Sequence, residues 1–99
     1  MATRSRRLSQ QTIDVLAALA EKRGGWLYGL QIAAATDLKS GSLYPILIRL
    51  DERGLLESKW IDSEHPGRPA RHAYRITGAG RAALSEALTT ATDLRGAPA

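Results

Sequence analysis

The most regular hydrophobic pattern in the chain lies at residues 40–53. Its apolar positions follow the three-to-four-residue period of one helix face: Leu43, Ile46, Leu47 and Leu50. Proline is tolerated in the first turn of a helix, because its missing N–H has no partner to lose there. Pro45 therefore predicts a helix that begins around Ser40–Ser42, with a serine as its N-cap. Gly54 is the expected residue just past the C-terminal end.

The remaining pattern predicts, in chain order, helices at 9–23 and 27–36, strands at 55–61 and 71–77, and a last helix at about 78–94. Ser9 is the expected N-cap of the first helix, and Thr77 that of the last. Two prolines and a glycine at 62–70 mark a loop between the strands. The resulting order, αααββα, predicts a mainly α fold with a small β-hairpin (α+β), a winged helix-turn-helix.

The first helix carries apolar residues on more than one side. Ile13 and Leu16 lie on one side, and Val15 and Leu19 lie on another. So wide an apolar arc needs burial on two sides, and in so small a protein we expect the second side to face another subunit.

Composition favours one folded domain of a cytoplasmic protein. The chain has 99 residues, 43% of them hydrophobic, and no cysteine, which fits a reducing compartment. No apolar run is long enough to span a bilayer, and the N-terminus lacks a signal core, so we expect no membrane association. We expect a basic, flexible arm at 1–8, one domain at 9–94 and a frayed end at 95–99.

The charge is basic and unevenly distributed. The formal net charge is +4, no acid precedes Asp14, and no acid occurs between His65 and Ser85. Two basic stretches without acids suggest contact with a polyanion, although solvated surface arginine explains the charge equally well. The N-terminal end of a helix can enter the major groove, and Lys39 and Tyr44 would lie beside such an end to contact phosphate.

Three segments closely resemble the PadR family of bacterial transcriptional regulators. They are "YGLQI" at 28–32, "GSLYPILIRLDERGLL" at 41–56 and "ARHAYRITGAGRAAL" at 70–84. The resemblance covers about residues 12–88 and is greatest to the short members of the family. It implies a homodimer that binds a pseudo-palindromic operator in double-stranded DNA and represses nearby genes.

The resemblance also implies roles for individual residues. A recognition helix at 40–53 and a wing at 62–71 would contact DNA. With Lys39 and the basic arm added, the expected DNA-binding residues are Arg4, Lys39, Ser40, Gly41, Ser42, Tyr44, Pro45, Arg49, Arg68, Arg71 and His72. The first and last helices would form the dimer, through Val15, Leu19, Leu84, Leu88, Ala91 and Leu94.

Other classes of function have little support. Two histidines, His65 and His72, without cysteine make a poor metal site, and no set of nucleophile and base points to an enzyme, so we expect no cofactor. We expect Trp26 and Trp60 to pack in the core or at the base of the wing. A small-molecule effector has no support in the sequence. A module that docks on protein or RNA stays as the alternative, and neither operator, regulated genes nor the choice between repression and activation can be read from the residues.

Overall fold

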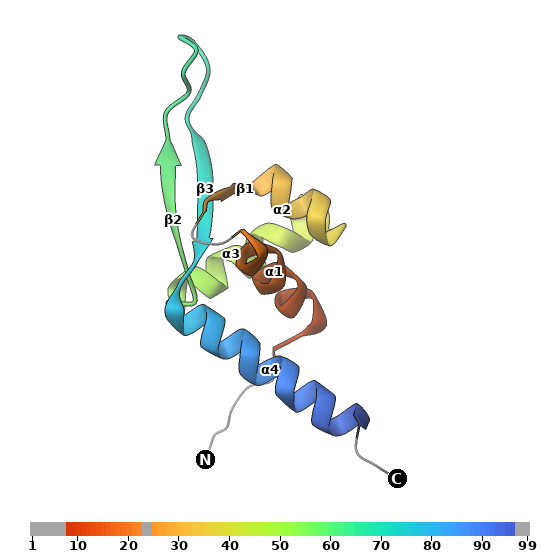
Figure 1. Ribbon diagram of the computed structural model, residues 1–99. Coiled ribbons are helices and arrows are strands. Elements are labelled where there is room, and N and C mark those ends of the chain that lie inside the picture. The colour runs from red at the N-terminus through yellow and green to blue at the C-terminus, as the bar shows by residue number, and fades with distance from the viewer. Residues whose placement is uncertain (1–7, 23–24, 97–99) are drawn as a thin grey trace.

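The computed structural model describes residues 8–22 and 25–96 as four helices and a three-stranded sheet, an α+β fold (Figure 1). In chain order the elements are α1 (Gln10–Glu21), β1 (Leu27–Tyr28), α2 (Gly29–Thr36), α3 (Ser40–Glu52), β2 (Leu56–Ile61), β3 (Arg71–Ile76) and α4 (Gly78–Gly96). Strands β2 and β3 form the long hairpin of the wing, and α4 projects from the opposite end of the molecule (Figure 1). No helix in the described part of the chain is long and apolar enough to cross a membrane.

The sheet contains one strand that the hydrophobic pattern did not predict. Its order is β1-β3-β2 and both pairings are antiparallel, with Tyr28 opposite Ala73 and Trp60 opposite His72. We expected residues 27 and 28 to open the second helix, but they pair with β3 and the helix begins at Gly29. The side chain of Gln31 accepts a hydrogen bond from the backbone N–H of Tyr28, which stabilises this helix start.

The core is built from all four helices and the sheet. Val15 and Leu19 of α1 and Leu84 of α4 are buried within the single chain, in the same cluster as Leu47 and Leu56. The expectation that these three residues face another subunit is therefore corrected. The second apolar side of α1 is covered by the chain itself, because α2, α4 and β3 all pack against this helix.

Helix α3 has the predicted buried stripe, start and end, but a different N-cap. Its N-cap is Lys39, without a side-chain hydrogen bond, so no serine caps it and Pro45 lies in the second turn. The missing N–H of Pro45 leaves the carbonyl of Gly41 without its helical partner, which is tolerated because Gly41 is exposed. At the other end Gly54 has φ of 75°, and the N–H of Leu55 donates to the carbonyl of Leu50 at 2.9 Å, a Schellman motif.

The start of α4 is tied to this same turn. Thr77 caps α4 by accepting a hydrogen bond from the N–H of Gly80, and its hydroxyl also donates to the carbonyl of Gly54. A side chain at Gly80 would overlap the carbonyl of Leu55, so the helix can approach the turn only through a glycine. From this anchor α4 runs to Gly96, two residues past its predicted end.

Candidate nucleic-acid interface

Helix α3 presents two contrasting faces. Leu43, Leu47 and Leu50 are buried in the core, whereas the opposite face of the helix is exposed to solvent. The exposed side chains there include all those that we expected to contact DNA on this helix, together with one apolar residue: Lys39, Ser40, Gly41, Ser42, Tyr44, Pro45, Ile48 and Arg49. Apart from the adjoining backbone of α3 itself, nothing in the described part of the chain lies within 4 Å of the position that a Cβ at Gly41 would take, so the helix start is open to close approach. Ile48 is 59% exposed.

Tyr44 lies where α3, α2 and the sheet meet. Its side chain is 39% exposed, and its hydroxyl lies against Gly29, the first residue of α2. Burial first, and then the nearby Tyr44 and Asp51, raise the pKa of Tyr74 above its ordinary value of 10.0, which keeps its phenol protonated. Tyr44 thus has one edge fixed against the protein and another available to a ligand.

Three rings of the wing lie in contact with one another, those of Trp60, His72 and Tyr74. The rings of Trp60 and His72 are nearly parallel, 9° apart, with centroids separated by 4.5 Å. His72 Nδ1 lies 3.0 Å from the hydroxyl of Tyr74, at hydrogen-bonding distance. These side chains share a sheet face with Ser58, whose hydroxyl donates to Asp51 of α3 at 2.9 Å. His72 therefore lies on the α3 side of the wing.

Arg71 lies on the other face of the sheet, because successive residues of a strand point in opposite directions. Its guanidinium lies 3.8 Å from the centroid of the Tyr28 ring. Lys59 and Arg75 share this face, and both lie over the ring of Trp26, at 4.3 and 4.5 Å. The structure thus separates Arg71 from His72, although they are neighbours in the sequence and were expected to act together.

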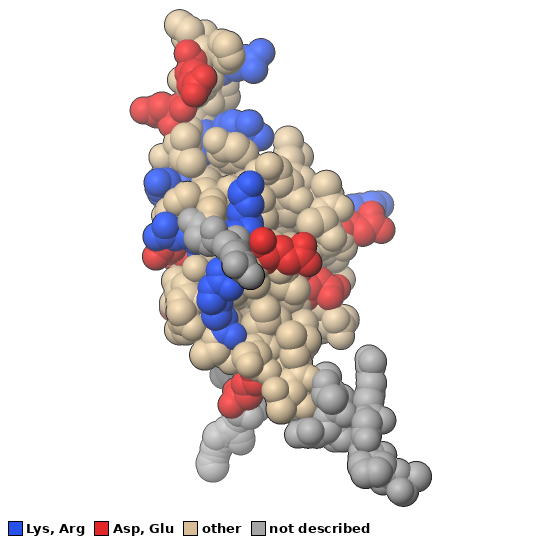
Figure 2. All heavy atoms as spheres, viewed as in Figure 1, with Lys and Arg blue, Asp and Glu red and all other residues tan. Residues whose placement is uncertain are grey.

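The tip of the wing is less basic than the stretch without acids from His65 onward suggested. Arg68 is exposed in the loop 62–70, but Asp62 and Glu64 are exposed in the same loop. Acidic and basic side chains stand together near the tip (Figure 2). Asp62 and Glu64 offset the charge of Arg68 in this loop. Attraction of Arg68 to phosphate therefore depends on where its side chain lies more than on the net charge of the wing.

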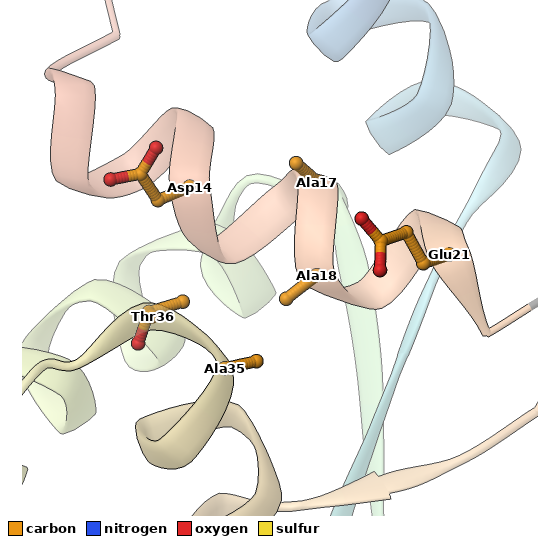
Figure 3. A pocket seen from close by; sticks show the side chains of 6 residues that line it. All are labelled: Asp14, Ala17, Ala18, Glu21, Ala35 and Thr36. Atoms are coloured by element: carbon orange, nitrogen blue, oxygen red, sulfur yellow. The ribbon is translucent and has the colours of Figure 1, made fainter.

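A shallow groove separates α1 from α2. Its volume is about 240 Å³, and Asp14 and Glu21 lie at its two ends (Figure 3). Between them are small residues: Ala17, Ala18, Ala35 and Thr36. Ligand pockets are larger, about 300–1,000 Å³, and mostly apolar or aromatic. This groove therefore gives no support for a small-molecule effector site.

Several expected features lie elsewhere or outside the described residues. Arg4 and the remainder of the arm up to residue 7 are outside them, as are the side chains of Ala91 and Leu94. Within the described ranges no group of three or more His, Cys, Asp or Glu side chains could hold a metal ion.

Two structural features of the candidate interface were missed from the sequence. Trp60 was expected to pack in the core or at the wing base; it stacks at the base of the wing but is 67% exposed. The contact of Tyr44 with Gly29 joins two motifs that are separated in the chain. The available signal for the exposed Trp60 was that it shares a strand face with the polar Ser58, two residues earlier. No local pattern signals the contact of Tyr44 with Gly29.

Comparison with known proteins agrees with this geometry. Residues 15–86 match the model of the transcriptional regulator PadR-like family. Transcriptional regulator Rv3488 of Mycobacterium tuberculosis is 44% identical over 72 residues, which are 71% of this chain and 63% of that protein, so the chain spans less than two thirds of that relative's length.

Solved structures of the family have the same fold. A PadR family regulator from Clostridium difficile superposes with a TM-score of 0.75 at 21% identity, covering 90% of this chain and 94% of that one. A PadR-like transcription factor from Bacteroides fragilis gives 0.72 at 26% identity, covering 88% and 84%. Members of this family are transcriptional regulators and not enzymes. The chain therefore belongs to the PadR-like family of transcriptional regulators.

Proposed function

We propose that the chain is a homodimeric repressor that binds a pseudo-palindromic operator in the cytoplasm, reading bases with α3 and contacting the flanking backbone with the wing. The observation that carries this proposal is the solvent-exposed face of α3. Its first turn exposes only Ser40, Gly41 and Ser42 beyond the lysine cap, and nothing crowds Gly41. A major groove about 12 Å wide admits such a helix end, whose unpaired N–H groups favour phosphate.

The positions of these residues suggest which of them contact bases and which contact the DNA backbone. Tyr44 and Arg49 continue the exposed face of α3, and Ile48 between them offers a methyl-bearing surface of the kind that contacts thymine. Lys39 at the helix start and Arg68 on the wing supply charge for the backbone, which fixes the orientation without reading sequence.

Helix α4 supports the proposed dimer. It has 19 residues, of which Leu84 packs into the core whereas Leu88, one turn further, is 48% exposed. Most of the stability of a helix in a protein comes from packing of its apolar face, which the single chain leaves incomplete at Leu88. A second copy of α4 would cover Leu88 and the following positions of the stripe, Ala91 and Leu94.

A docking module for protein or RNA is the second candidate. It is favoured by the exposure of Ile48, and by Leu30 on α2, which is 75% exposed. Apolar contacts of that kind would depend little on salt, whereas binding through phosphates weakens steeply as salt rises.

The experiment that tests the proposal is selection of binding sites from randomised duplexes by the purified chain. We expect enrichment of a two-fold symmetric sequence whose half-site centres lie about one helical turn, roughly 34–36 Å, apart. Enrichment of a single asymmetric half-site would contradict the dimer. If no sequence is enriched, α3 does not read bases, and capture of RNA or protein on the same immobilised chain would favour the docking module.

A further inference from the structure

Trp60 is a large aromatic side chain that the fold leaves exposed. Two thirds of its surface is accessible, more than that of Tyr44 or Ile48. We propose that Trp60 is a DNA contact of the wing, and that the free face of its indole packs against a deoxyribose of the backbone that flanks the groove entered by α3. This inference rests on the proposed function.

The neighbours of the indole fix its orientation. Its inner face stacks on His72 with centroids 4.5 Å apart, and His72 is held in turn by the hydroxyl of the buried Tyr74 at 3.0 Å. The rings of His72 and Tyr74 are themselves in contact, with centroids 4.7 Å apart. An aromatic group that is already ordered loses little conformational entropy when it binds, so the stack makes Trp60 a pre-organised contact.

The position of the stack favours DNA as the occupant. Trp60 shares the sheet face of Ser58, which is hydrogen-bonded to Asp51 of α3. Through His72 it is in contact with Tyr74, which packs in the core cluster with Leu43 and Leu47 of α3. A surface that follows a helix in the groove meets the sugar–phosphate backbone next, and a ring face packs there on apolar sugar atoms without regard to sequence.

Trp26 gives a matched internal control. The chain has two tryptophans, and Trp26 lies on the opposite sheet face, beneath Lys59 and Arg75. The Trp26→Phe variant leaves Trp60 as the single indole emitter, and Trp60→Phe leaves Trp26. If one variant folds poorly by circular dichroism, the difference between wild type and the other variant still separates the signals of the two indoles.

The test titrates each protein with an unlabelled random-sequence duplex of 30 base pairs at low salt, where binding needs no operator. Binding is followed in parallel by anisotropy of the same duplex carrying a dye. We expect the emission of Trp26→Phe to fall as the duplex saturates it, and the emission of Trp60→Phe to stay constant. Trp60→Ala should weaken affinity about five- to tenfold, the lower part of the range for a ring contact. The slope of log affinity against log salt should stay unchanged, because indole neutralises no phosphate.

Each contrary outcome has a distinct meaning. Saturation by anisotropy with constant Trp60 emission would overturn the contact while leaving the proposed DNA binding intact. An equal change at Trp26 would show a general rearrangement and overturn the assignment to this face. Emission of Trp60 that depends on protein concentration without DNA would assign the ring to self-association. Absence of duplex binding in the anisotropy arm would overturn the proposed function together with this inference.

Discussion

The hydroxyl of Tyr44 occupies the space that a side chain at Gly29 would need. Gly29 opens α2 and Tyr44 lies in the second turn of α3, so this contact sets how the two helices of the helix-turn-helix meet. It also explains physically why a Tyr-Gly pair and a Leu-Tyr-Pro string occur in one chain. The glycine is needed because a tyrosine from the next helix packs on it.

Gly29→Ala should therefore weaken DNA binding more than it weakens the fold. A methyl group there overlaps the end of the Tyr44 side chain, which can swing toward solvent and leave its binding position. We expect about tenfold weaker affinity in anisotropy titrations, which corresponds to about 1.4 kcal/mol, with a thermal midpoint close to that of wild type.

A double-mutant cycle provides the control for this prediction. Tyr44→Phe removes the hydroxyl that overlaps the new methyl group, so Gly29→Ala should cost less affinity in that background. Strictly additive losses would show that Gly29 acts on DNA independently of Tyr44.

Gly80→Ala should destabilise the domain by about 3 kcal/mol, because the obstacle is the backbone carbonyl of Leu55, which cannot move aside as a side-chain tip can. The measurement is urea unfolding followed by circular dichroism. Gly78→Ala, two residues earlier in α4 with nothing within 4 Å, is the control and should be neutral or slightly stabilising. Equal effects at both positions would mean that α4 does not need its close approach to the α3–β2 turn.

Leu88→Glu should convert the proposed dimer into folded monomers, because the side chain is exposed in the single chain and would be buried between two copies of α4. Sedimentation gives the mass, and circular dichroism checks the fold. Ala82→Glu places the same charge on an exposed position of α4 outside the Leu84–Leu88 stripe and should leave the dimer intact. A dimer that persists in Leu88→Glu would place the interface elsewhere. Leu84 is unsuitable for this test, since a charge there would unfold the core.

The two wing arginines should behave differently. Arg68→Ala removes an exposed cation from the loop 62–70 and should reduce the slope of log affinity against log salt by about one. Arg71→Ala should leave that slope nearly unchanged, because its guanidinium lies over Tyr28 on the sheet face opposite His72. The same loss of slope in both variants would show that DNA reaches both faces of the wing.

Local signals predicted the parts of this fold that depend on neighbours in the chain. The stripe of α3, the cap at Ser9, the glycine end at Gly54 and the cap at Thr77 each involve residues within about one helical turn, and all four are confirmed. The start of α3 at Ser40 agrees with the prediction, but its N-cap is Lys39 and not a serine. Pro45 lies in the second turn and not the first, because the exposed Gly41 tolerates the missing hydrogen bond.

Features that depend on tertiary packing were not predictable from one sequence. Strand β1 has two residues, and its pairing with β3 is decided more than forty positions away. The wide apolar arc on α1 predicts that Val15 and Leu19 are buried, but it does not say which surface covers them. In the structure other elements of the same chain cover both residues. The stack of Trp60 on His72 depends on the register across the wing loop, which periodicity does not fix.

The most direct test of the central claim is the affinity of the chain for its selected duplex and for a scrambled duplex of equal composition, measured by anisotropy across a salt series. We expect the selected duplex to bind at least about a thousandfold more tightly, with both affinities falling steeply as salt rises. Equal affinity for the two duplexes would show that the exposed face of α3 reads no sequence, and the account of this chain as a sequence-specific regulator would be wrong.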